Sequence, residues 1–177
     1  MAPRLKGRIK RKPALLVLLV VGVVGGVLIF ALQARPSASS PSVVGLEKGY
    51  VGTTYAFDGA VCLGSATVAA TVLSVEVEQA RGSTARLVLP PEDGTPILGF
   101  PTDDDGRDVT GYRVPAGQDD CTLRLLVRPE ATGAVRPGGV KVRLGYGPLG
   151  LLRRTAQVRP QVVLDVTGEG QDPRAAR

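Results

Sequence analysis

The sequence contains no histidine, no tryptophan and no asparagine. Without histidine the chain lacks the most common general base of enzymes, and its two cysteines are too few for an ordinary zinc site. Without asparagine it has no acceptor for N-glycosylation. It also lacks the nucleophile-elbow, P-loop and dinucleotide-binding motifs. We therefore expect a chain that is not an enzyme and that holds no cofactor.

Positive charge is concentrated at the start of the chain. Six of the 22 Lys and Arg residues stand within the first 12 positions, without an acidic residue among them. The remaining 16 basic residues equal the 16 Asp and Glu residues, so the formal charge of +6 comes from this short segment. A basic terminus of this kind indicates membrane topology more than a phosphate-binding surface. We expect no nucleic-acid partner.

An apolar run of 19 residues, 14–32, follows the basic segment. At about 1.5 Å per residue such a helix covers ~28 Å, close to the ~30 Å hydrocarbon core of a bilayer. The run predicts one transmembrane helix in the lipid bilayer, with a cytoplasmic N-terminus and an extracellular C-terminal domain. A cleaved signal peptide is the alternative, and its apolar core is usually shorter. Gly22 and Gly26 have the G-x-x-x-G spacing, which predicts a homodimer through this helix.

The composition shifts along the chain predict five segments. They are a basic cytoplasmic tail at 1–13, the transmembrane helix at 14–33, a Pro/Ser-rich linker at 34–44, an extracytoplasmic β-sandwich domain at 45–167 and a disordered tail at 168–177. The abundance of Arg, Ala, Val, Gly and Pro is typical of a high-GC bacterium.

Beyond the linker, apolar residues recur at every second position between Gly- and Pro-rich turns, which is typical of strands. Two opposite phases of this alternation within 67–78 predict a β-bulge. The neighbouring strand at 85–89 is expected to form a hairpin with 73–78. Because no helical period is sustained, the sequence predicts an all-β fold, with a β-sandwich as its architecture.

The two cysteines, Cys62 and Cys121, both lie in the predicted exported domain, where an even number predicts a disulfide. Closing a loop of this length would contribute about 4 kcal/mol to stability. Two buried free thiols are the alternative. The spacing resembles that of the immunoglobulin fold, but the tryptophan that packs on its disulfide is missing and Asp119 stands where that fold has its corner tyrosine. The sandwich is Ig-like by analogy only, and no function is transferred from it.

Acidic residues cluster around a glycine in the segment 103–108. Asp103, Asp105 and Asp108 are candidate ligands for a metal such as Ca²⁺, which prefers oxygen ligands. In the EF-hand alignment, however, proline and tyrosine occupy the first and last ligand positions. A solvated acidic turn is the alternative.

The predicted domain is polarised in charge. Residues 92–120 carry a net charge of −6, whereas residues 121–159 carry +7. The basic residues that alternation directs outward are Arg124, Arg128, Lys141, Arg143, Arg153, Arg154 and Arg159. From this set we predict an interaction face of Arg124, Arg128, Lys141 and Arg143 that meets another envelope protein or an anionic wall polymer. Pairing with the acidic loops is the alternative.

These features predict a single-pass membrane-anchored extracytoplasmic protein that acts as a non-catalytic interaction or structural module at the cell envelope. The second interpretation is an extracytoplasmic module that binds or senses a ligand or Ca²⁺ through the loops between 90 and 120.

Overall fold

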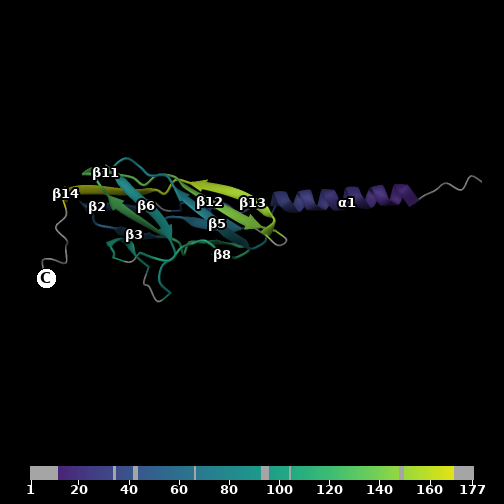
Figure 1. The fold of residues 1–177 in the computed structure, drawn as a ribbon, viewed down its shortest axis with the longest axis horizontal. Helices are drawn as coiled ribbons and strands as arrows, with labels where there is room; N and C mark the ends of the chain where they lie inside the picture. Colours follow the sequence, from purple (N-terminus) through teal and green to yellow (C-terminus); the bar gives the residue numbers. More distant parts are fainter. Residues whose placement is uncertain are drawn as a thin grey trace, which may run out of the picture. The chain divides into compact units, whose positions relative to one another are not determined.

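The computed structural model describes residues 12–33, 35–41, 44–65, 67–92, 96–103, 105–147 and 150–169. Contacts divide the chain into two compact units, Met1–Gln33 and Ala34–Arg177. The first unit contains helix α1 (Lys12–Gln33) and the second contains the described strands (Figure 1). Most of the tail predicted at 1–13 lies outside the described residues. So does most of the tail predicted at 168–177, whose first two positions belong to the last strand.

Helix α1 forms at the apolar run. Among the elements that the structure describes, no helix has both the length and the apolar character that crossing a membrane requires. The transmembrane character predicted for 14–33 is therefore not shown, and the predicted single-pass location in the cell membrane is withdrawn. Gly22 and Gly26 both lie in α1, with open space where a Cβ atom would stand, and their role in dimerisation stays a prediction.

The second unit consists mostly of β-strands in several sheets and contains one disulfide, Cys62–Cys121. Within the described residues, one sheet has the order β1 (Ser37–Ser39), β4 (Cys62–Ser65), β9 (Gln118–Asp120), and a second has β6 (Ser83–Val88), β10 (Arg124–Pro129), β3 (Tyr55–Asp58), β7 (Leu98–Pro101). A third has β11 (Gly133–Val135), β14 (Val162–Glu169), β2 (Val44–Val51), and a fourth has β13 (Leu152–Val158), β12 (Val140–Tyr146), β5 (Ala70–Val77), β8 (Arg113–Val114). The predicted all-β character and the predicted disulfide are confirmed.

The sheet β13-β12-β5-β8 is the one that positions the candidate site. In Figure 1 it lies at one end of the β unit, and β11, β14 and β2 lie at the other end. Its inner strand β12 alternates from Val140 to Leu144, so that Val140, Val142 and Leu144 are fully buried while Lys141 and Arg143 point outward. Strand alternation, read directly from the sequence, therefore decides which side chains reach solvent.

Strands β12 and β13 pair antiparallel in continuous register. On the other side of β12, Arg143 pairs with Ser74 but Leu144 pairs with Val72. The extra residue, Leu73, is the predicted β-bulge, and it turns an apolar side chain that is 37% exposed toward the outer face.

The predicted hairpin between 73–78 and 85–89 is wrong. Strand β5 pairs with β12 and β8, whereas β6 pairs with β10 in another sheet. The chain changes sheet at Gln79, whose side-chain carbonyl accepts a hydrogen bond of 3.2 Å from the backbone N–H of Ala85. At this point a hydrogen bond to a side chain stands where a hairpin would have a backbone–backbone hydrogen bond between its two strands.

Candidate functional site

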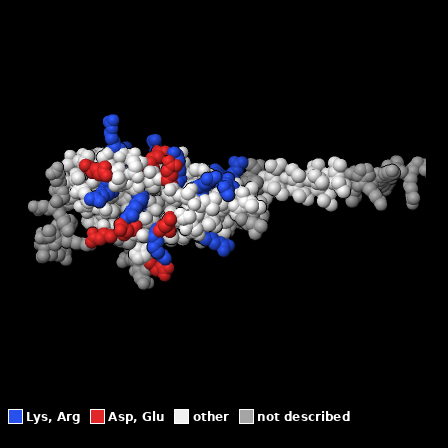
Figure 2. All heavy atoms as spheres, in the orientation of Figure 1, with Lys and Arg blue, Asp and Glu red and all other residues white. Residues whose placement is uncertain are grey.

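Outward side chains of β5, β12 and β13 form what we call the basic face. The strand register places Ser74, Arg143 and Thr155 in one row across the sheet, and Glu76, Lys141 and Gln157 in the next. Arg153, two residues before Thr155, belongs to the same side of β13. In the space-filling view, Lys and Arg side chains gather over the region of β12 and β13, where Asp and Glu are sparse (Figure 2).

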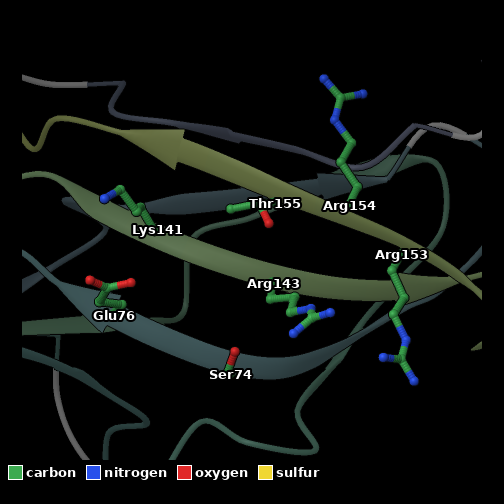
Figure 3. Close-up of a pocket in the computed structure, with 7 residues that line it drawn as sticks. All are labelled: Ser74, Glu76, Lys141, Arg143, Arg153, Arg154 and Thr155. Atoms are coloured by element: carbon green, nitrogen blue, oxygen red, sulfur yellow. The ribbon is translucent and has the colours of Figure 1, made fainter.

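An open groove of about 420 Å³ lies on the basic face. It is lined by Ser74, Glu76, Lys141, Arg143, Arg153, Arg154 and Thr155 (Figure 3). Arg143 and Arg153 point to the same side of the sheet in this view, whereas Arg154 points to the opposite side. The two guanidinium groups and the hydroxyls of Ser74 and Thr155 give this groove a donor-rich lining.

Beside Arg153, neighbouring strands approach each other closely. A Cβ atom at Gly145, which pairs with Arg153, would stand 3.3 Å from both terminal methyl carbons of Leu73 and 3.4 Å from the carbonyl oxygen of Gly150. The bulged Leu73 therefore covers the position of a missing side chain. Any larger residue at 145 would compete with Leu73 for this space.

The cations of the basic face are not equivalent. The Lys141 ammonium lies 2.9 Å from the Glu78 carboxylate. The hydrogen bond and the charge of Glu78 raise the pKa of Lys141, and the same contact lowers the pKa of Glu78. Among the described residues, Arg143 and Arg153 form no ion pair.

Three carboxylates of the acidic loops, those of Asp105, Glu92 and Asp120, contact groups outside the basic face. The Asp105 carboxylate accepts a hydrogen bond from Arg86, and Arg107 lies 3.0 Å from Glu92. Asp120 accepts hydrogen bonds from the hydroxyls of Tyr112 and Thr122. Burial, followed by this contact with Asp120, raises the pKa of Tyr112. The alternative in which the loops pair with the basic face is therefore not what the described residues do.

The candidate metal ligands are spread over different contacts. Asp105 is engaged by Arg86, and Asp108 accepts hydrogen bonds of 2.9 and 3.0 Å from the backbone N–H and the hydroxyl of Thr110. These two hydrogen bonds lower the pKa of Asp108. Throughout the part of the chain that the structure describes, no three His, Cys, Asp or Glu side chains cluster as metal ligands would. Asp103 is among the described residues and belongs to no such cluster.

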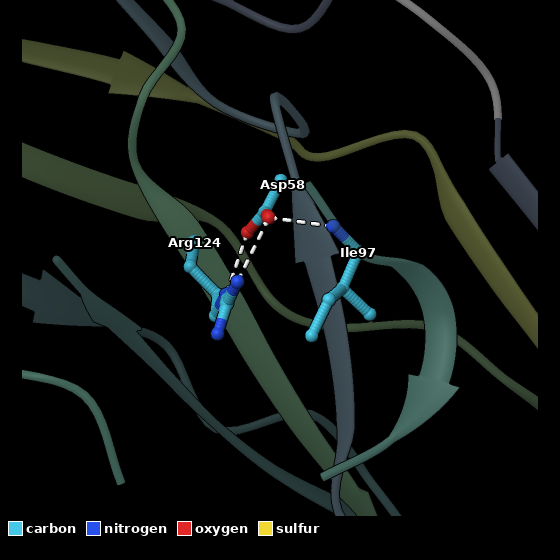
Figure 4. Close-up of polar contacts among 3 residues, drawn as sticks. All are labelled: Asp58, Ile97 and Arg124. Atoms are coloured by element: carbon cyan, nitrogen blue, oxygen red, sulfur yellow. Dashed lines mark hydrogen bonds and ion pairs between the residues drawn. The ribbon is translucent and has the colours of Figure 1, made fainter. Parts of the chain in front are cut away.

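Arg124 does not belong to an exposed face. Its side chain is 1% exposed, and its Nε and Nη2 atoms lie 2.6 and 2.9 Å from the two carboxylate oxygens of Asp58 (Figure 4). The same carboxylate accepts a 2.7 Å hydrogen bond from the backbone N–H of Ile97. This buried pair joins β3, β10 and the segment before β7. The prediction that Arg124 contacts a partner is corrected accordingly.

Arg128 is exposed, but it lies on β10, in a different sheet from Lys141 and Arg143. The predicted interaction face therefore splits into a buried residue, a residue of another sheet and two residues of the basic face. Sequence reasoning did not single out Ser74 and Thr155, and the pairing of three strands that brings them beside Arg143 was not readable from local alternation. Arg153, which alternation did direct outward, completes the groove.

Comparisons with known proteins give distant matches. No protein family and no curated protein matches the sequence. Among solved structures, the VesB protease of Vibrio cholerae matches with 12% identity and a TM-score of 0.40, over 78% of this chain and 34% of that one. The secreted serine protease VesC of Vibrio cholerae matches with 10% identity and a TM-score of 0.37, over 84% of this chain and 26% of that one. The chain thus spans about a third or less of each protease.

These matches correct two predictions. In view of them we withdraw the predicted non-catalytic interaction or structural module and the prediction that the chain is no enzyme. We also withdraw the alternative of a ligand- or Ca²⁺-sensing module that uses the loops between 90 and 120, and the location at the cell membrane. At these identities and TM-scores the matches assign neither an activity nor catalytic residues to this chain.

Proposed function

We propose that the chain binds anions through the groove of the basic face. Arg143 and Arg153 hold the oxygens of a phosphate or sulfate group, and the hydroxyls of Ser74 and Thr155 donate further hydrogen bonds. A guanidinium presents its N–H donors as a planar fork, which matches the geometry of oxyanions. The observation that carries this proposal is that two exposed arginines without an ion pair among the described residues line one groove with two hydroxyls.

The exposure of the groove sets the strength of this binding. Near the surface, a charge pair at about 4 Å has a Coulomb energy of roughly 1 to 4 kcal/mol, which salt screens further. One oxyanion is therefore held weakly and reversibly. An anionic polymer, which the sequence analysis named as a partner, would offer several such groups to the same face.

The architecture that presents this groove is, we propose, a β-sandwich. Support comes from one continuous cluster of buried side chains that combines inward residues of separate sheets, such as Val142 of β12, Leu125 of β10 and Leu164 of β14. Two packed layers bury one face of each sheet and leave the other to solvent, as the alternation on β12 requires. The basic face is then the outer side of one layer.

The direct test is calorimetric titration of the full chain with tripolyphosphate. Charge reversal by Arg143→Glu or Arg153→Glu is expected to weaken binding by about tenfold or more, equivalent to about 1.4 kcal/mol. Arg128→Glu is the matched control, because it makes the same change at an exposed arginine of another sheet. The proposal fails if the parent chain does not bind, or if the control loses as much affinity as the two groove variants.

A further inference from the structure

A second groove, of about 690 Å³, lies beyond the far end of β13. Its walls come from the segments 78–80, 136–139 and 159–163, and its exposed cations are Arg136 and Arg159. The loop 136–139 is held close to β5, because the backbone N–H of Glu78 donates a 2.8 Å hydrogen bond to the carbonyl oxygen of Gly139. This approach requires glycine, since a Cβ atom at Gly138 would stand 1.8 Å from the carbonyl oxygen of Glu78.

The two grooves lie on one face of the sheet. Alternation along β13 directs Arg153, Thr155 and Gln157 outward, and Arg159 follows in the same phase directly after the strand. At about 3.4 Å per residue, Arg153 and Arg159 are separated by ~20 Å along the chain direction. The row between them contains no acidic residue, so an extended chain of negative charge meets no repulsion from β13.

The acidic residues of this face stand two strands away. Glu76 and Glu78 lie on β5 and just beyond its end, separated from β13 by β12. With strands about 4.8 Å apart, the β5 backbone lies ~10 Å from that of β13, but the acidic side chains reach the grooves: Glu76 lines the first and Glu78 lines the second, where Arg159 acts on its charge. Lys141 lies on β12, the strand between β5 and β13, and forms an ion pair with Glu78. Each groove thus has one glutamate on its β5 side, whereas the row along β13 carries only positive or neutral side chains.

From this arrangement we infer that the ligand is a linear polyanion with regularly spaced phosphate or sulfate groups, which lies along β13 and occupies both grooves. This inference rests on the proposed function, because the first groove is the anion site proposed above. Simultaneous contact with two separated sites raises affinity without any new type of contact. Nucleic acid is not the favoured polymer, since none of the described residues that line the two grooves is aromatic and able to stack on a base.

The chain-length dependence of binding tests the inference. Full-length protein is titrated with tripolyphosphate and with long-chain polyphosphate at equal phosphate concentration. The long chain is expected to bind about a hundredfold more tightly, as two linked contacts would. Reversing both arginines of the second groove, Arg136→Glu with Arg159→Glu, is expected to remove this advantage and to leave tripolyphosphate binding within about twofold of the parent.

Gln157→Glu supplies an independent variant, because it places one negative charge midway between the grooves at an exposed position. It is expected to weaken the long chain by about tenfold and to leave the short one unaffected. Arg128→Glu is the control for overall charge. If tripolyphosphate binds the parent but chain length has no effect, the two-groove inference is overturned while the proposed function stands. Single-stranded DNA of equal charge that binds as tightly as polyphosphate would also overturn it, whereas no binding of either polyphosphate would overturn both.

Discussion

Strands β10 and β12 each carry an arginine that alternation directs to the outer side of a sheet, but the two side chains differ in their exposure to solvent. Arg124 on β10 is buried against Asp58, whereas Arg143 on β12 points into an open groove. The outer side of β10 is partly covered, because Ile97 packs there on a small cluster of Ala56, Val88 and Leu126. Around Arg143, the outer side of β12 is an open groove.

This difference shows that alternation predicts the side of a sheet and not access to solvent. Asp58 and Arg124 are 66 positions apart in the chain, so no local pattern connects them. A charged side chain on a covered face must find a partner, since burying it alone costs several kcal/mol. The same type of residue therefore stabilises the fold on β10 and is available for binding on β12.

The largest expected effect comes from removing the buried partner. Arg124→Ala leaves the Asp58 carboxylate in place without its cation, and we expect a loss of about 3–5 kcal/mol in the free energy of unfolding. Arg143→Ala, the matched exposed change, is expected to stay within about 0.5 kcal/mol of the parent. Urea unfolding followed by circular dichroism measures both values. Similar losses for the two variants would remove the distinction between the faces.

A double variant sharpens this point. Replacing the pair with apolar residues, Asp58→Leu with Arg124→Met, removes both charges together, so we expect it to be more stable than Arg124→Ala alone. A double variant as unstable as the single one would show that the polar contacts, including the one to Ile97, matter more than the uncompensated charge.

A smaller effect is expected from the framework of the basic face. Gly138→Ala forces a methyl group into the backbone of Glu78 and is expected to cost about 1–3 kcal/mol in the free energy of unfolding. Gly45→Ala is a suitable control, because no atom lies within 4 Å of its Cβ position. Chemical denaturation of both variants is the measurement. Equal stabilities would mean that the loop 136–139 is free to move away from β5.

The smallest effect concerns pH. Lys141 lowers the pKa of Glu78, so the ion pair is fully present above the ordinary glutamate pKa of about 4.3 and is lost as the pH falls through the lower value. The raised pKa of Lys141 preserves the pair up to the alkaline range. Protonation of Glu78 frees the Lys141 ammonium, and we therefore expect dextran sulfate to bind a few times more tightly at low pH.

The variant Glu78→Gln checks the origin of this step. It frees Lys141 at every pH, so affinity for dextran sulfate at neutral pH is expected to rise and the step at acidic pH to shrink. Glu76 and Arg159 also act electrostatically on this pair and set what remains of the step. An unchanged step in Glu78→Gln would assign the pH dependence to other carboxylates.

Much of the fold was readable from periodicity. Alternation predicted a strand with a bulge within 67–78, where β5 lies, and directed Lys141 and Arg143 of β12 outward, and the cysteine count predicted the disulfide. The sheet change at Gln79 was not predictable, because it depends on a side-chain contact with Ala85. The groove was half predictable: Lys141 and Arg143 followed from alternation, but Ser74 and Thr155 join them through strand pairing across the sheet.

The central claim is that exposed arginines of the basic face bind anions while the buried arginine does not. Arginine side-chain N–H signals, assigned by substitution and followed by NMR during titration with tripolyphosphate, test it most directly. We predict that the Nε–H signals of Arg143 and Arg153 shift in a saturable way while that of Arg124 stays in place. The account would be contradicted if the Nε–H signals of Arg143 and Arg153 did not shift. It would also be contradicted if the signal of buried Arg124 shifted as much as that of exposed Arg128.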